Sequence, residues 1–195
     1  MASELSRRNL FRLRPVDYLQ LFRESTSPAS KEVPNHHYRP PGAVPDEASF
    51  LTICERCHAC SDACPHGVIE HLGPISGNAE GTPVLNPEIN PCRWCPELDC
   101  IQACPSGALS LRSDGTAPPI AKVSLNPESC LNEQGILCDT CVMHCPPSVR
   151  ALTLVSRKPQ LNPDACTGCG LCAFHCEASP GAFSIHPSDY SIRTA

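Results

Sequence analysis

Sixteen cysteines fall into four groups of four along a chain of 195 residues. The first cysteines of the groups are Cys54, Cys92, Cys130 and Cys166, at steps of 38, 38 and 36 residues. A near-constant period of this length indicates an internal repeat. Only 5% of the residues are aromatic and 22 are proline, so each repeat has little apolar material for a core. The chain therefore repeats one small cysteine-rich unit four times.

The spacing within the groups is typical of ligands for iron–sulfur clusters. Group one follows the bacterial ferredoxin pattern, with gaps of two, two and three residues between its cysteines and Pro65 after them. In that pattern three cysteines bind one [4Fe–4S] cluster and the fourth binds a neighbouring cluster. Groups two and three have longer gaps, and group four has Glu177 in place of the proline. The candidate metal ligands are Cys54, Cys57, Cys60, Cys64, Cys92, Cys95, Cys100, Cys104, Cys130, Cys138, Cys141, Cys145, Cys166, Cys169, Cys172 and Cys176.

Sixteen thiolates at four per cluster predict four [4Fe–4S] clusters as the cofactors. A secreted disulfide scaffold also has an even number of cysteines, but it does not repeat a cluster-type loop at a constant period. Zinc sites pair two C-x₂-C knuckles, whereas three cysteines crowd each loop here. Cys54, Cys57 and His58 match the C-x-x-C-H motif of haem attachment, but that use would leave Cys60 and Cys64 without a role.

Local patterns around the cysteines predict a repeated α+β unit of strand, cysteine loop, short helix and strand. The tripeptide Leu-Asn-Pro precedes groups two, three and four and indicates a strand that ends in a loop. An apolar alternation typical of a short strand follows the same groups, at residues 108–111, 151–154 and 182–185. We expect a ferredoxin-like fold with little regular secondary structure, in which two pseudo-twofold modules each hold a pair of clusters. The expected repeats lie near residues 50–82, 83–121, 122–157 and 158–187.

The ends of the chain differ in composition from the cysteine-rich region. We expect a basic, amphipathic segment over residues 1–24, a proline-rich linker over 25–49, the four-cluster domain over 50–187 and a tail over 188–195. The first segment is a candidate docking element. Its candidate docking residues are Arg7, Arg8, Leu10 and Phe11.

The N-terminus also bears on the compartment. Arg7 and Arg8 resemble the twin-arginine export motif, but the apolar stretch of a signal peptide is missing. We therefore expect a cytoplasmic protein, free or associated with a membrane, and a periplasmic one if the Arg7-Arg8 motif works as an export signal. No run of 18 apolar residues occurs, so no transmembrane segment is expected. The formal net charge of −5 provides no basic surface for nucleic acid.

The predicted cofactors limit what the chain can do. A cluster with four thiolate ligands has no open coordination position, so it transfers one electron and does not bind a substrate. The sequence therefore predicts an electron carrier or accessory subunit that is not itself an enzyme, with redox proteins as partners. Each oxidised cluster with its thiolates adds about two negative charges, which favours a basic docking face on the partner.

The cysteine-rich region resembles the NapF/NapG/MauM group of ferredoxin-type proteins, which are linked to periplasmic nitrate reductase and related systems. The resemblance covers about residues 50–187 and is specific because three motifs occur together. These motifs are Cys130-Leu131-Asn132 with Leu137-Cys138-Asp139-Thr140-Cys141, Cys100-Ile101-Gln102-Ala103-Cys104-Pro105, and Cys166-Thr167-Gly168-Cys169-Gly170.

The resemblance implies a NapF-like role, with a NapG- or MauM-like role as the alternative. A NapF-like chain is an accessory ferredoxin that passes electrons to a molybdoenzyme such as nitrate reductase, or helps it to mature. A NapG- or MauM-like chain transfers electrons from a membrane quinol dehydrogenase to a periplasmic redox enzyme. The short start with Arg7 and Arg8 is similar to NapF, whereas group two and Glu177 are similar to NapG.

The resemblance also implies a nested exchange of ligands, in which group one pairs with group four and group two with group three. Sequential pairing, of group one with two and group three with four, stays open at this point. The nested scheme implies four ligand sets: Cys54, Cys57, Cys60 and Cys176; Cys64, Cys166, Cys169 and Cys172; Cys92, Cys95, Cys100 and Cys145; and Cys104, Cys130, Cys138 and Cys141.

Overall fold

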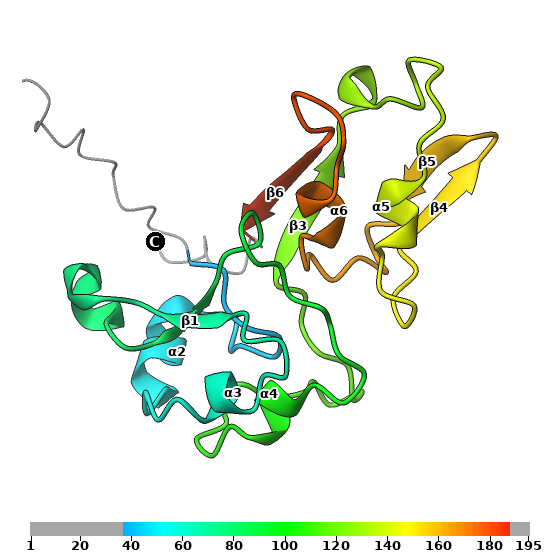
Figure 1. Ribbon diagram of the computed structural model, residues 1–195. Coiled ribbons are helices and arrows are strands. Elements are labelled where there is room, and N and C mark those ends of the chain that lie inside the picture. The colour runs from blue at the N-terminus through cyan, green and yellow to red at the C-terminus, as the bar shows by residue number, and fades with distance from the viewer. Residues whose placement is uncertain (1–36, 188–195) are drawn as a thin grey trace, which may run out of the picture. The chain divides into compact units, whose positions relative to one another are not determined.

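The structure is a computed structural model that describes residues 37–187. Short helices alternate with short strands along this part of the chain (Figure 1). Their bounds are α2 (Glu47–Ile53), α3 (Ala59–Asp62), β1 (Ile69–His71), the 3₁₀ helix η2 (Pro74–Ala79), β2 (Pro83–Leu85), α4 (Asp99–Gln102), β3 (Ala121–Leu125), the 3₁₀ helix η3 (Pro127–Ser129), α5 (Thr140–Met143), β4 (Leu152–Val155), β5 (Lys158–Leu161), α6 (Leu171–Phe174) and β6 (Phe183–Pro187).

The strands form antiparallel pairs that divide the described residues into a first half (37–117) and a second half (118–187). In each half a hairpin separates the two cysteine groups: β1 pairs with β2, and β4 pairs with β5. In the second half β3, before group three, pairs with β6, after group four. In the first half the corresponding contact is a single bridge between Ala43 and Leu109. Both halves therefore share one order around their cysteine groups, helix, strand, strand and helix: α3, β1, β2 and α4 in the first half, and α5, β4, β5 and α6 in the second.

The predicted short helix occurs in all four cysteine groups. Each helix has four residues, and the second of them is the third cysteine of its group. The fourth cysteine of each group comes two residues after the helix ends. These helices contain Cys60, Cys100, Cys141 and Cys172.

The Leu-Asn-Pro tripeptides end strands, as predicted: Leu85, Leu125 and Leu161 are the last residues of β2, β3 and β5. The asparagine that follows each leucine accepts a hydrogen bond, through Oδ1, from the backbone N–H two residues later. This local turn competes with continuation of the strand. The three tripeptides therefore mark the same turn from strand to cysteine loop.

The apolar alternations give a mixed result. Residues 152–155 and 183–187 form β4 and β6, but residues 108–111 form no strand and make only the bridge at Leu109. The segment opposite them contains Pro40 and Pro41, which are buried and have no N–H to donate. The ladder in the first half therefore does not extend beyond this bridge.

Residues 37–49 lie within the expected linker but are packed against the first half. The Arg39 side chain is 8% exposed, and its guanidinium donates to the Glu47 carboxylate, to Thr82 Oγ1 at 2.9 Å and to the Pro83 carbonyl at 2.6 Å. Its Cζ atom also lies 4.7 Å from the centroid of the Phe50 ring. The folded region therefore starts earlier than the residue 50 expected from proline content, because a buried charged residue holds this segment in place.

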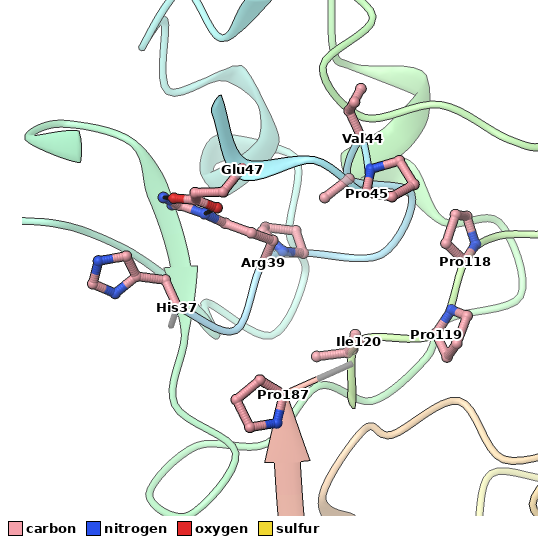
Figure 2. A pocket seen from close by; sticks show the side chains of 11 residues that line it. His37, Arg39, Val44, Pro45, Glu47, Pro118, Pro119, Ile120 and Pro187 are labelled. Atoms are coloured by element: carbon pink, nitrogen blue, oxygen red, sulfur yellow. Dashed lines mark hydrogen bonds and ion pairs between the residues drawn. The ribbon is translucent and has the colours of Figure 1, made fainter. Parts of the chain in front are cut away.

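Arg39 and Glu47 also line a cavity of about 490 Å³ in which no cysteine takes part. Figure 2 shows these two side chains together on one side of it, with Pro118, Pro119 and Ile120 on another. The cavity is separate from the cysteine sites described below.

Cysteines make up part of the core in both halves. The larger cluster of buried side chains includes Phe50, Val68, Ile69 and Leu85 of the first half together with cysteines, and it extends to Ile120 and Ala121 at the start of the second half. The second cluster consists of Cys141, Leu152 and Cys172 only. The cluster confined to the second half is therefore small, and cysteines are two of its three buried side chains.

Two expectations concern residues outside the described range. The candidate docking residues Arg7, Arg8, Leu10 and Phe11 lie before residue 37, and the tail over 188–195 lies after the last described residue. Among residues 37–187, no helix is long and apolar enough to cross a membrane.

Candidate metal centres

Three cavities are each lined by four cysteines. They are open to solvent, and the empty space in them, solvent included, is about 350, 310 and 320 Å³. In each cavity three cysteines come from one group and the fourth from the other group of the same half. The three quartets are Cys92, Cys95 and Cys100 with Cys64; Cys166, Cys169 and Cys172 with Cys145; and Cys130, Cys138 and Cys141 with Cys176.

The remaining four cysteines belong to the first half. Cys60 lies close enough to Cys54 and Cys104 for their charges to affect its ionisation. Cys57 stands in the same loop as Cys54 and is exposed. Cys104, the fourth cysteine of group two, thus lies near group one. In the same way Cys64, the fourth cysteine of group one, lies with group two.

These quartets contradict the nested pairing. Cys64 lines a cavity with group two instead of group four, and Cys176 lines a cavity with group three instead of group one. The reason is that the hairpin between two consecutive groups turns the chain back, so that α3 contacts α4 and α5 contacts α6. The structure follows the sequential pairing that the sequence left open.

The spacing of the side chains suits a group larger than one metal ion. Four thiolates around a single zinc ion stand about 2.3 Å from it and close to one another. Within residues 37–187, no three His, Cys, Asp or Glu side chains are grouped closely enough to hold one ion. Four cysteines around a cavity fit a cube of iron and sulfide, which thiolates bind at its corners.

The backbone of the cysteine loops also favours an anion. The second residue after the first cysteine has a positive φ in three groups: Arg56 at 55°, Trp94 at 48° and Gly168 at 69°. A left-handed residue within a tight loop turns successive N–H groups toward one side, a geometry common at iron–sulfur sites. An L residue pays about 1 kcal/mol or more for this conformation, so its presence at Arg56 and Trp94 points to a constraint on the loop.

Group three differs because its first gap is longer and Asn132 stabilises the loop instead. Cys138 N–H donates to Asn132 Oδ1 at 3.2 Å, and the Asn132 amide donates to the Cys138 carbonyl. This pair of bonds holds Cys138 beside Cys130 across seven intervening residues. Asn132 belongs to one of the motifs that carry the resemblance, but the sequence alone does not reveal this role. An asparagine close to a cysteine ligand in a long loop only weakly predicts such a pair of hydrogen bonds.

Three cysteine sulfurs accept backbone hydrogen bonds. The donors are Trp94 N–H to Cys92 Sγ at 3.4 Å, Leu109 N–H to Cys104 Sγ at 3.4 Å, and Ala182 N–H to Cys176 Sγ at 3.3 Å. Bonds of this type stabilise negative charge on sulfur and influence the reduction potential of a bound cluster.

Burial disfavours the free thiolate at several of the cysteines. It raises the pKa of Cys60 to about 11, and of Cys92 and Cys100 to about 12. It also raises the pKa of Cys172, where neighbouring cysteines add to the effect. Such thiols are protonated at neutral pH unless a metal takes the place of the proton. These four positions therefore favour a cysteine bound to cationic iron over a free thiolate.

Glycines allow the group-four loop to approach other backbone closely. A Cβ atom on Gly168 would lie 2.1 Å from the Ala121 carbonyl oxygen, and one on Gly170 would lie 2.6 Å from Pro87 Cβ. Ile120 N–H donates to the Thr167 carbonyl at 2.8 Å. These contacts place the loop directly against the start of β3.

Two families of iron–sulfur proteins match parts of the chain. One is described as a 4Fe-4S dicluster domain and matches residues 53–108, and the other is described as a 4Fe-4S binding domain and matches residues 159–178. The dicluster match spans groups one and two. It therefore agrees with the pairing of consecutive groups.

Curated relatives are ferredoxin-type proteins. The methylamine utilization ferredoxin-type protein MauM of Methylophilus methylotrophus is 38% identical over 165 residues, which cover 79% of this chain and 72% of MauM. NapG of Haemophilus influenzae is 36% identical over 164 residues, 77% of this chain, which spans 59% of that relative. NapF of Escherichia coli is 35% identical over 144 residues, 72% of this chain and 80% of NapF.

Proposed function

Because the chain belongs to the family of ferredoxin-type proteins that includes NapG, MauM and NapF, we propose that it carries electrons between redox proteins on four [4Fe–4S] clusters. The observation that carries this proposal is the grouping of cysteines into quartets around cavities of similar volume. Sixteen cysteines are enough for four such clusters with none left over.

The proposed clusters form two pairs, one in residues 37–117 and one in residues 118–187. Exchange of the fourth cysteine within each half is supported by the cavities and by the dicluster match. The proposed ligand sets are Cys54, Cys57, Cys60 and Cys104; Cys64, Cys92, Cys95 and Cys100; Cys130, Cys138, Cys141 and Cys176; and Cys145, Cys166, Cys169 and Cys172.

The chemistry that the clusters supply when bound is one-electron oxidation and reduction. The chain contributes the thiolates that hold the iron and the backbone donors that tune its environment. Backbone N–H groups that donate to Cys92, Cys104 and Cys176 favour the more negative, reduced state. All iron positions are occupied by cysteine in this scheme, so no substrate site is needed and the chain acts as a carrier.

The partner role that we favour is a conduit between a membrane quinol dehydrogenase and a redox enzyme, as the resemblance implies for NapG- and MauM-like chains. The matches to NapG and MauM cover 77% and 79% of this chain, compared with 72% for NapF. This role requires the surface of the chain that contacts the redox enzyme to be in the same compartment as that enzyme.

A second role is supported by a different observation. The match to NapF covers 80% of the length of that relative, compared with 59% of NapG from Haemophilus influenzae. A NapF-like chain would supply electrons to a molybdoenzyme in the cytoplasm, or help it to mature. Both roles use the same clusters and differ in partner and compartment.

Anaerobic affinity purification from the host distinguishes the two roles. The tagged chain is recovered separately from the periplasmic, cytoplasmic and membrane fractions, and the proteins bound to it are identified by mass spectrometry. A membrane quinol dehydrogenase as partner supports the conduit role. A cytoplasmic molybdoenzyme as partner contradicts it and supports the NapF-like role, and recovery of protein without iron contradicts both.

A further inference from the structure

The two halves differ at one surface position that their shared arrangement makes equivalent. In every cysteine group, the last residue of the four-residue helix stands two positions after the third cysteine. This position is Asp62 in α3 and Gln102 in α4, but Met143 in α5 and Phe174 in α6. Helices α3 and α4 are in contact, as are α5 and α6 (Figure 1). The polar pair in the first half thus corresponds to an apolar pair in the second half.

The apolar pair is not part of the core. Met143 is 74% exposed and Phe174 is 43% exposed. Asp62 and Gln102 are exposed too, which indicates that the fold of a cysteine group does not require an apolar side chain at this position. Exposed Met and Phe side chains on contacting elements are typical of binding surfaces.

Two histidines connect the apolar pair into one surface. The residue after each helix is Ala63 or Ala103 in the first half, but His144 or His175 in the second. The rings of His144 and His175 are stacked, with centroids 3.5 Å apart and an angle of 8° between their planes. The Phe174 ring meets the His175 ring edge-on at 4.9 Å. We call Met143, His144, Phe174 and His175 the apolar patch.

The apolar patch lies beside both candidate metal centres of the second half. His144 immediately precedes Cys145, and His175 immediately precedes Cys176. These two cysteines line different cavities. A protein that covers the patch would therefore contact residues adjacent to the ligands of two proposed clusters, where a short path for an electron is available.

The distribution of charged residues favours one kind of partner at the apolar patch. The first half has ten acidic and four basic residues, and the second half has five acidic and four basic residues. The two clusters proposed for each half would add about four negative charges to both, so a partner with a basic face would be attracted more strongly to the first half than to the second. A partner that docks at the patch gains mainly from burial of apolar surface, and its contact face needs few charges.

We propose that the apolar patch is the docking surface for a redox protein whose contact face is apolar and nearly uncharged. This proposal rests on the proposed function and specifies the face of the chain through which an electron is exchanged. In the step concerned, one electron leaves the reduced chain and is taken up by the oxidised cofactor of the partner. The substitutions that test it exchange the patch residues for those of the first half, Met143→Asp and Phe174→Gln.

The test uses the full-length holoprotein, reduced with dithionite and freed of excess reductant under anaerobic conditions. The probes are the soluble extract and the washed membranes of the host, and reoxidation is followed by visible absorbance. The matched control is Ile75→Asp, which removes another exposed apolar side chain, 87% exposed, from the first half. Ferricyanide serves as a small oxidant that needs no docking surface, and iron analysis checks that each variant retains its clusters.

Wild type and Ile75→Asp are expected to be reoxidised at the same rate by one of the two fractions. Met143→Asp is expected to slow this rate about tenfold, the effect of losing one central contact residue, without changing the rate with ferricyanide. An increase from 50 to 500 mM salt is expected to change the wild-type rate less than about twofold, because screening acts on charges. A photo-crosslinker at position 143, and not one at position 75, is expected to join a protein that contains a redox cofactor.

Three outcomes would overturn the proposal. They are equal rates for wild type and Met143→Asp, a steep fall of the wild-type rate with salt, and crosslinks at position 75 but not at position 143. If neither fraction reoxidises the wild-type protein although ferricyanide does, the proposed function fails first and this inference fails with it.

Discussion

Cys64 and Cys100 line the same cavity although they belong to different cysteine groups, and the charge of Cys64 affects the ionisation of Cys100. The hairpin β1–β2 lies between them in the sequence and returns the chain so that α3 contacts α4. Consecutive groups are therefore brought together by the shortest connection between them. The second half repeats this relationship between Cys145 and Cys172.

The pairing of ligands can be tested with double variants. Cys64 and Cys92 line one cavity, so Cys64→Ala with Cys92→Ala is expected to damage one cluster and to leave the second half intact. Cys64→Ala with Cys166→Ala is expected to damage one cluster in each half, because these cysteines line different cavities. Native mass spectrometry under anaerobic conditions counts the clusters that remain. The reverse result, with the greater loss in the first double variant, would support the nested pairing.

The close approach of Gly168 to Ala121 predicts a large effect of a single methyl group. Gly168→Ala places a Cβ atom 2.1 Å from the Ala121 carbonyl oxygen at a φ of +69°, so either β3 or the group-four loop must move. We expect a loss of about 3 kcal/mol or more in the free energy of unfolding, measured as the denaturant midpoint of cluster loss. Gly115→Ala is the control, because its φ is +79° but no atom lies within 4 Å, and it is expected to cost about 1 kcal/mol. Equal effects would show that the contact at Gly168 does not constrain the loop.

The contacts of Arg39 predict that residues 37–49 stabilise the first half. Arg39→Ala removes the hydrogen bonds to Glu47, Thr82 and the Pro83 carbonyl. We expect a loss of about 3 kcal/mol, because buried polar partners are left without a donor. Limited proteolysis is expected to cleave the variant near α2 faster than the wild type. Arg112→Ala, at an exposed position, is the control and should be cleaved at the wild-type rate.

Removal of iron is expected to affect the two halves unequally. Leu152 is the one buried apolar residue other than cysteine in the cluster confined to the second half, and burial of one leucine contributes about 2 kcal/mol. The other buried apolar residues described in residues 118–187, cysteines aside, are few and mostly small: Ile120, Ala121, Ala151, Leu171 and Ala182. The first half also buries Phe50, Val68, Ile69 and Leu85. After anaerobic chelation under reducing conditions, hydrogen exchange should therefore lose protection first in residues 118–187. Equal protection in both halves, or native-like protection of the second half, would contradict the role of clusters as its core.

Local features of the fold could be predicted from the sequence because they depend on a few neighbouring residues. The turn at each Leu-Asn-Pro tripeptide is made by the asparagine itself, as at Asn126, which accepts from Glu128 N–H. The short helices follow from the cysteine spacing. The strand expected at residues 108–111 failed because its partner segment contains Pro40 and Pro41, which no local pattern at residue 109 could reveal.

Features that depend on contacts distant in sequence could not be predicted in the same way. The pairing of cysteine groups is decided by how the hairpins return the chain, and all four groups look equally able to exchange a ligand. The packing of residues 37–49 depends on Arg39 reaching Thr82 and Pro83, whereas proline content alone indicates an extended segment. The apolar patch depends in the same way on the fold, which places Met143 and Phe174 at the positions that Asp62 and Gln102 occupy in the first half.

The most direct test of the central claim is the cluster content of the full-length chain purified anaerobically from its host. Native mass spectrometry, together with iron and acid-labile sulfide analysis, measures it without assuming a partner. The account predicts a mass increase that equals four [4Fe–4S] clusters, with sixteen iron and sixteen sulfide per chain, four of each for every cysteine quartet. Two clusters, bound zinc or disulfides among the sixteen cysteines would contradict it.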